Sequence, residues 1–182
     1  TGVEWLKRLI AFVTVSRHSN LALIEEVQAY CISLGLEPVL TFNDTTDTEH
    51  SSNKANQSKA NLFVSVPAGG GLADTASATI KGGIVLSGHT DVVPVDGQDW
   101  LSDPFKAEIR GDKLYGRGAC DMKGFIACAL NLLPQAVALS QQGQLRKPLH
   151  LALSFDEEVG CLGAPLMLEE LSQRGINPDY CI

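Results

Sequence analysis

The 182-residue chain lacks several features that would place it in other classes of protein. Lysine and arginine number only 14 against 21 acidic residues and form no cluster, so the basic surface that nucleic acid requires is not expected. No apolar run approaches the ~20 residues of a membrane span, and no charged-then-apolar leader opens the chain. We therefore expect no nucleic-acid or membrane partner, and a cytoplasmic location.

Cysteine occurs five times but in no C-x-x-C pair. An odd number of widely spaced cysteines favours neither a disulfide framework nor a structural zinc knuckle. Cys120 is the one cysteine beside a candidate site, and no histidine near it in the sequence would activate it as a nucleophile. Most cysteines are therefore expected to be buried thiols. The full set is Cys31, Cys120, Cys128, Cys161 and Cys181.

The apolar residues, 45% of the chain, fall into alternating helix-like and strand-like patterns. Helical spacing predicts a helix over residues 21–34, with Ser19 and Asn20 as N-caps and Gly35 after its end. Further helices are predicted at 123–139 and 166–173, strands at 39–42, 61–67, 82–88, 149–155 and from 180, and a hairpin around Gly111-Asp112. The polar stretch 43–59 is predicted to be a surface loop without chemistry. The alternation indicates an α/β fold with a largely parallel sheet and no domain boundary.

Acidic and imidazole side chains follow two of these strands and precede one helix. His89 and Asp91 follow strand 82–88, Glu157 and Glu158 follow strand 149–155, and Asp121 precedes the helix that begins at 123. Catalytic groups of α/β sheets gather at the carboxyl ends of strands, so these residues are expected to converge. Each one alone also has an ordinary structural explanation, as a hydrogen-bonded histidine, a solvated acid or an N-cap.

Three adjacent acids at a strand end, Asp156, Glu157 and Glu158, would repel one another unless a cation lies among them. One imidazole with carboxylates and no thiolate suits zinc or a similar divalent ion better than calcium. Asp121 could bridge two such ions about 3.5 to 4 Å apart. The side chains of adjacent glutamates diverge, so one could bind metal while the other takes a proton from water. The pattern indicates metal-assisted hydrolysis.

Two alternatives come from other classes of protein. The G-x-G of "YGRGACDMKG" is superficially like a dinucleotide-binding turn, but Asp121 occupies the third glycine position and its charge opposes a pyrophosphate. A non-catalytic binding module could keep the fold without metal, although the many ligand-type residues at strand ends count against it. The other histidines, His18, His50 and His150, are expected to be structural.

Four ordered motifs, "SGHTDVVP", "WLSDPF", "LYGRGACDMKG" and "DEEVGCLGA", resemble the metallopeptidase family of succinyl-diaminopimelate desuccinylase, aminoacylase, carboxypeptidase G and acetylornithine deacetylase. They are most similar to those of acetylornithine deacetylases. The resemblance implies a three-layer, zinc-exopeptidase-like α/β fold with a mixed, largely parallel sheet. It also implies two divalent metal ions, with Zn²⁺ expected and Co²⁺ as an alternative. The resemblance implies that His89 and Glu158 each bind one ion and that Asp121 bridges the two. It implies Glu157 as the general base and Asp91 as the carboxylate that accepts a hydrogen bond from the other ring nitrogen of His89. It also implies a cis peptide bond between Asp121 and Met122.

The resemblance further implies a reaction and a larger protein. The expected reaction is hydrolysis of N-acetylornithine to ornithine and acetate, a step of arginine biosynthesis in the cytoplasm, with desuccinylase, aminoacylase and dipeptidase activities as alternatives. A complete family site adds a carboxylate after the strand that Tyr180 begins and a distant histidine, and neither occurs up to Ile182. Residues 1–182 are therefore expected to be the N-terminal part of a catalytic metal-binding domain that alone binds metal weakly and is inactive. An inserted domain is expected to make the whole protein a homodimer.

Overall fold

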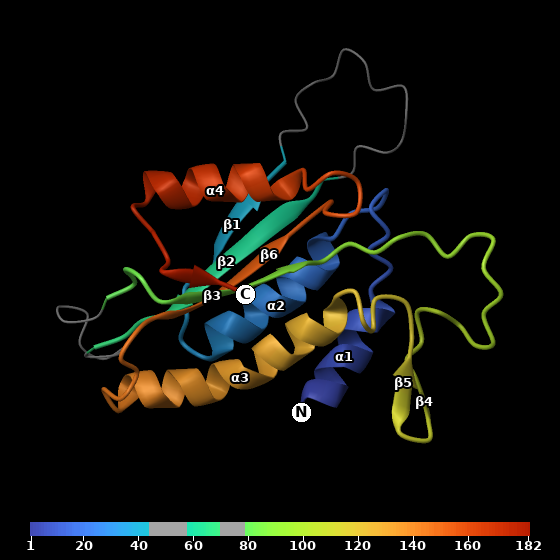
Figure 1. Cartoon of the computed structure of the whole chain (residues 1–182), viewed down its shortest axis with the longest axis horizontal. Coiled ribbons are helices and arrows are strands. Elements are labelled where there is room, and N and C mark those ends of the chain that lie inside the picture. The colour runs from blue at the N-terminus through green and yellow to red at the C-terminus, as the bar shows by residue number, and fades with distance from the viewer. Residues whose placement is uncertain (44–57, 70–78) are drawn as a thin grey trace, which may run out of the picture.

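The computed structural model describes residues 1–43, 58–69 and 79–182, and their helices and strands form three layers. The helices are α1 (Gly2–Ala11), α2 (Leu21–Ser33), α3 (Lys123–Gln141) and α4 (Gly163–Gln173). The strands are β1 (Val39–Phe42), β2 (Ala60–Val66), β3 (Ile84–His89), β4 (Glu108–Arg110), β5 (Lys113–Tyr115), β6 (Leu149–Ser154) and β7 (Tyr180–Cys181). Figure 1 shows the central sheet between α4 on one side and α1, α2 and α3 on the other. The predicted three-layer α/β fold is confirmed.

The central sheet has the strand order β1-β2-β6-β3-β7, and it is mixed. β3 pairs in parallel with β6 and β7, whereas β2 pairs antiparallel with β1 and β6. Parallel neighbours need a crossover, and here α3 connects β3 to β6 while α4 connects β6 to β7. No described helix separates β1, β2 and β3 in the chain. The mixed sheet is confirmed, but the described sheet is evenly divided rather than largely parallel.

Two cores lie on opposite faces of the sheet. The larger one fills the space between the sheet and α1, α2 and α3, and it includes Leu9, Val27 and Leu62. The smaller one lies under α4 and includes Phe63 and Met167. Adjacent residues of β2 therefore contribute to both cores, because successive side chains of a strand point to opposite faces. This central strand is therefore buried on both sides.

The helix α1 lies outside the predicted elements. Thr1 caps its start, because the Thr1 hydroxyl accepts a hydrogen bond from the Glu4 amide at 3.3 Å. Trp5 and Leu9, one turn apart, form its buried face. The sequence T-x-x-E before an apolar pair was the signal for this helix.

The N-terminus of α2 also differs from its prediction. Asn20 precedes the helix but does not cap it; its side-chain amide donates to Ala60 O and Thr90 Oγ1, both at 2.8 Å. The Leu21 amide instead donates to the Ser19 hydroxyl at 3.2 Å. Of the two predicted caps, Asn20 therefore makes tertiary contacts and Ser19 accepts the amide at the start of the helix.

Among the described residues, α3 is the one helix long and apolar enough to cross a membrane by length and composition. This corrects the expectation that no apolar run approaches a span. Ile126, Leu130 and Leu133 of α3 are buried in the larger core, as in a core helix. α3 continues past Pro134, which lies within it.

Cys31 is buried, whereas the other four cysteines are exposed, so the prediction of mostly buried thiols is wrong. Their positions explain this: Cys120 and Cys161 lie in loops, Cys128 lies on α3 and Cys181 lies on β7, where no described element covers them. His150 has the expected structural role, because its ring contacts Ser65 Oγ at 2.8 Å and Gly82 O at 2.9 Å. His50 and most of the polar stretch lie outside the described residues.

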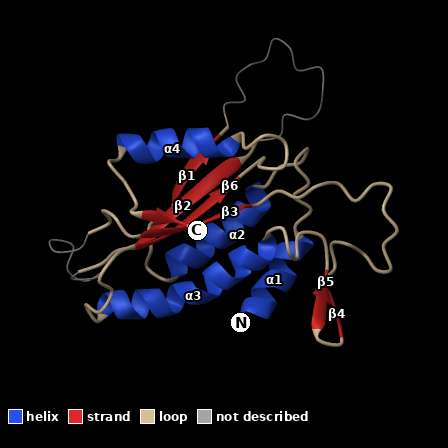
Figure 2. Ribbon diagram, viewed as in Figure 1, coloured by secondary structure: helices blue, strands red, loops and turns tan. Residues whose placement is uncertain are grey.

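The hairpin of β4 and β5 forms around Gly111-Asp112 as predicted. Figure 2 shows it standing apart from the central sheet, reached through a long loop after β3. A second, shorter connection after β5 returns the chain to Asp121 and the start of α3.

Candidate metal centre

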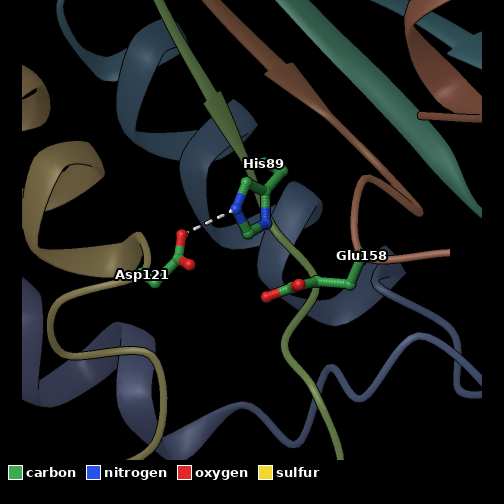
Figure 3. A group of neighbouring side chains, drawn as sticks. All are labelled: His89, Asp121 and Glu158. Atoms are coloured by element: carbon green, nitrogen blue, oxygen red, sulfur yellow. Dashed lines mark hydrogen bonds and ion pairs between the residues drawn. The ribbon is translucent and has the colours of Figure 1, made fainter. Parts of the chain in front are cut away.

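The predicted site residues meet where two parallel strands end. β3 and β6 are neighbours, and His89 at the end of β3 is in register with Ser154 at the end of β6. The chain beyond β6 carries Glu158, and the chain before α3 carries Asp121. One ligand atom each from His89, Asp121 and Glu158 lies within 4.8 Å of the others. Figure 3 shows these three side chains facing a common space.

The orientation of the His89 ring is fixed by its own neighbourhood. Nδ1 lies 3.0 Å from the carbonyl oxygen of Asp91, which can only accept, so Nδ1 carries the proton of this hydrogen bond. Nε2 lies 3.1 Å from Asp121 Oδ1 and 3.7 Å from Glu157 Oε2. Nε2 is therefore the nitrogen that faces the acidic groups and is available to a metal ion.

Asp91 lies beside His89, but its carboxylate makes stronger contacts elsewhere. Asp91 Oδ1 is 3.5 Å from His89 Nδ1, farther than the backbone carbonyl oxygen of the same residue. The carboxylate accepts hydrogen bonds from Ser16 Oγ at 2.7 Å and from the amides of Glu157 and Glu158 at 3.0 and 3.2 Å. Asp91 thus orients His89 mainly through its backbone and holds the two glutamates through its side chain.

The side chain of Asp91 is only 3% exposed, and these contacts keep its carboxyl group ionised. Burial by itself would raise its pKa, but hydrogen bonds from the imidazole, the Ser16 hydroxyl and two amides outweigh burial, so the pKa lies below its usual value. His89 responds in the opposite direction. Burial would lower the pKa of the imidazole, but Asp91 and Asp121 raise it to about 9.

The acidic groups crowd one another on the open side of this site. Burial and the charges of Asp121, Glu157 and Asp91 raise the pKa of Glu158, while the charge of His89 opposes the rise. When His89 is protonated, it places a positive charge beside the carboxylates of Asp91, Asp121 and Glu157. One imidazole nitrogen and carboxylate oxygens within 4.8 Å are a donor set that fits a divalent ion such as Zn²⁺.

Asp156, which precedes the two glutamates, does not face this group. Its carboxylate oxygens lie 2.5 and 2.6 Å from the ammonium of Lys59, and both residues are buried. Burial raises the pKa of Asp156, and the hydrogen bonds and charge of Lys59 oppose that rise. The expected repulsion among three acids therefore applies to only two of them. The prediction that residues 43–59 form a surface loop is wrong at Lys59, which is buried.

A second buried lysine lies behind Asp121. The ammonium of Lys123 donates to the carbonyl oxygens of Leu9 and Phe12 at 2.9 and 2.8 Å, which joins the end of α1 to the start of α3. Burial lowers the pKa of Lys123 to about 7, and the charge of Asp91 opposes this effect. The Asp121-Met122 peptide bond beside it is cis, as the family resemblance implied.

The fold and the ligand group define an α/β protein with a candidate divalent-metal site at the ends of its parallel strands. The chain belongs to peptidase family M20/M25/M40, whose family model matches residues 85–182. The matched region contains all five predicted site residues. The resemblance stated from the four motifs is thereby confirmed.

Curated relatives include two kinds of amide hydrolase by name. The chain is 32% identical, over 99% of its length, to acetylornithine deacetylase of Yersinia pseudotuberculosis, of which it covers 42%. It is 42% identical over 100 residues, 54% of the chain, to succinyl-diaminopimelate desuccinylase of Gluconobacter oxydans, of which it covers 25%. The chain thus spans less than half the length of these relatives.

Among solved structures, human carnosine dipeptidase 1 matches 99% of this chain with a TM-score of 0.71 and 22% identity. The match covers 37% of that dipeptidase. A similar match, with a TM-score of 0.71 and 19% identity, is found with an M20 family metallo-carboxypeptidase from Sulfolobus solfataricus. At this level of identity the two matches show a shared fold.

Proposed function

We propose that the whole protein is a metal-dependent hydrolase of linear amides that removes the acetyl group of N-acetylornithine. One observation carries this proposal: Nε2 of a buried, oriented histidine and the oxygens of Asp121 and Glu158 lie within 4.8 Å of one another, with Glu157 beside them. A ligand group with a spare carboxylate is what hydrolysis by activated water needs. The two longer relatives with amide-hydrolysing names support the same reaction class.

In the proposed reaction, His89 and Glu158 would each hold one metal ion and Asp121 would bridge the two. The bound ions, expected to be Zn²⁺ with Co²⁺ as an alternative, would supply Lewis-acid polarisation of the amide carbonyl. Glu157 accepts a proton from the attacking water and returns it to the leaving amine. The side chain of Glu157 is 44% exposed, which leaves it open to solvent and to a substrate.

The proposal also covers features of the whole protein. It includes two further metal ligands, a homodimer formed through an inserted domain, and a role in cytoplasmic arginine biosynthesis. The described residues alone offer three ligands to a centre that would hold two ions. The 182-residue chain by itself is therefore expected to bind metal weakly and to lack turnover.

A succinyl amide is the second candidate substrate, because one relative is a desuccinylase by name and is 42% identical to this chain over 100 residues. An acetylornithine deacetylase of Salmonella arizonae is 44% identical over 101 residues, so the acetyl amide remains the first candidate.

The proposed function can be tested on the purified whole protein loaded with Zn²⁺ or Co²⁺. Release of the free amine from N-acetylornithine, N-succinyl-diaminopimelate, N-acetylmethionine and a dipeptide would be compared. We expect the highest kcat/KM for N-acetylornithine. A metal-loaded protein that hydrolyses none of the four would contradict the enzymatic proposal and favour the binding module, whereas preference for the succinyl amide would identify the second candidate.

Metal binding to the 182-residue chain should depend on pH. Because the pKa of His89 is raised to about 9, its Nε2 carries a proton at neutral pH that a metal ion must displace. We expect the apparent Co²⁺ association constant to rise ~10-fold per pH unit between pH 6.5 and 8.5, measured by visible absorbance. His89→Gln, which cannot release this proton, should bind more weakly and with a smaller slope. Equal slopes in the two proteins would contradict the assignment of His89 as ligand.

A further inference from the structure

A buried hydrogen-bond ring lies behind the glutamates, and Lys59 is its one cation. The Lys59 ammonium donates to both carboxylate oxygens of Asp156 and to the carbonyl oxygen of Ser16. The hydroxyl of the same Ser16 donates to Asp91 Oδ2 at 2.7 Å. The Asp91 carboxylate then accepts the amides that follow Asp156 in the chain. The ring thus starts and ends on one short turn.

That turn is the segment that carries the acidic pair. Asp156 has a φ of 55°, a left-handed conformation that few residues other than glycine adopt without support. The turn after β6 is closed by amides of Gly160 and Cys161, which both donate to Glu157 O at 3.0 Å. Support from outside the turn comes from Lys59 on one side and from Asp91 on the other.

The ion pair of Lys59 and Asp156 is buried, so its loss would leave a buried charge without a partner. The side chains of Lys59 and Asp156 are 6% and 10% exposed, so little water reaches either charge. A buried carboxylate that loses its cationic partner must either move towards solvent or become neutral. Movement of Asp156 would shift the residues directly after it, which are the two glutamates.

We propose that Lys59 is a positioning residue of the candidate metal site, which sets the turn carrying Glu157 and Glu158 by binding Asp156 and Ser16 at once. This inference rests on the proposed function only for the role of the two glutamates. Lys59 acts through the backbone of the turn and touches neither the ligand group nor a substrate. Its own position is set by β2, which begins at the next residue, and by the Lys59 amide, which donates to Asn43 Oδ1 at 2.7 Å.

The test compares Lys59→Met with Lys147→Met in the 182-residue chain. Lys147 is a matched control, because it also pairs with an aspartate, Asp179, at 3.1 Å, but on the surface. Two quantities are measured: Co²⁺ affinity with its visible spectrum, and hydrogen exchange of the Glu157 and Glu158 amides in the metal-free chain. Lys59→Met is expected to weaken Co²⁺ binding ~10-fold or more, to alter the spectrum and to speed exchange of both amides, whereas Lys147→Met changes none of them.

A second variant keeps the test decisive if Lys59→Met folds poorly. The double variant Lys59→Met, Asp156→Asn leaves no unpaired buried charge, and asparagine tolerates positive φ. It should fold, yet still show faster exchange of the two amides and altered Co²⁺ spectra, because the link to Ser16 is lost. A folded double variant with the exchange rates and Co²⁺ affinity of the unaltered chain would overturn the proposal.

Failure of this inference can be told apart from failure of the proposed function. If the whole protein hydrolyses no amide but Lys59→Met still speeds exchange in the metal-free chain, the positioning role stands and the enzymatic proposal fails. If the whole protein hydrolyses N-acetylornithine and Lys59→Met leaves exchange and Co²⁺ binding unchanged, the enzymatic proposal stands and the positioning role of Lys59 fails.

Discussion

Replacing Glu157 with glutamine in the whole protein is expected to lower kcat by ~10²- to 10⁴-fold while the metal content stays the same. Glutamine has nearly the same shape but cannot take a proton from water. The backbone of residue 157 would remain in place, because its amide donates to Asp91 Oδ1 at 3.0 Å irrespective of the side chain. Turnover of N-acetylornithine and metal content by atomic absorption would be measured on the same preparation.

The matched variant is Asp121→Ala, which should lose metal as well as turnover. Asp121 Oδ1 lies 3.1 Å from His89 Nε2, on the side of the ring that faces the ligand group, whereas Glu157 Oε2 is more distant at 3.7 Å. The proposed division of roles therefore predicts two different outcomes from two carboxylates of the same site. If both variants lost metal, or if both kept it, Glu157 and Asp121 would not have the separate roles assigned to them.

The convergence of the ligand group was predictable because it depends on topology. The apolar runs 82–88 and 149–155 predict two strands, and the helix between them in the chain makes them parallel, so their carboxyl ends meet at one edge. The approximate spans of these elements are visible in the sequence. What an apolar pattern cannot show is the order of strands that lack a helix between them, which is why the antiparallel pairing of β2 was not anticipated.

The buried polar contacts behind the site could not be predicted from the sequence. Lys59 ends a polar stretch and Ser16 begins the polar run 16–20, so each is grouped by the sequence with surface residues. They are buried because chain segments 75 or more residues apart meet there, as the contacts of Ser16 with Asp91 and of Lys59 with Asp156 show. Charge and hydropathy along the chain report local preference, whereas pairing of a buried charge is decided by the tertiary fold.

Asp91→Ala is expected to destabilise the 182-residue chain by about 3–5 kcal/mol, in addition to weakening activity of the whole protein. The contacts of Asp91 with His89 account for the effect on activity. The structure adds a stability effect, because removal of this buried carboxylate leaves Ser16 Oγ and two backbone amides without their acceptor. Urea denaturation of the metal-free chain at pH 7 would measure the loss of stability.

Asp96→Ala is the control, because Asp96 pairs with Arg17 at 3.0 Å on the surface and its side chain is 70% exposed. Its removal should leave the free energy of unfolding nearly unchanged, because solvent screens an exposed ion pair. The pH dependence gives a second check. The pKa of Asp91 is held below its usual 3.8, so its contribution is present above that pH and is lost as pH falls through the lowered pKa. The difference in unfolding free energy between the unaltered chain and Asp91→Ala should therefore become smaller in acid. If Asp91→Ala and Asp96→Ala were equally stable at pH 7, the Asp91 carboxylate would not hold the two glutamates.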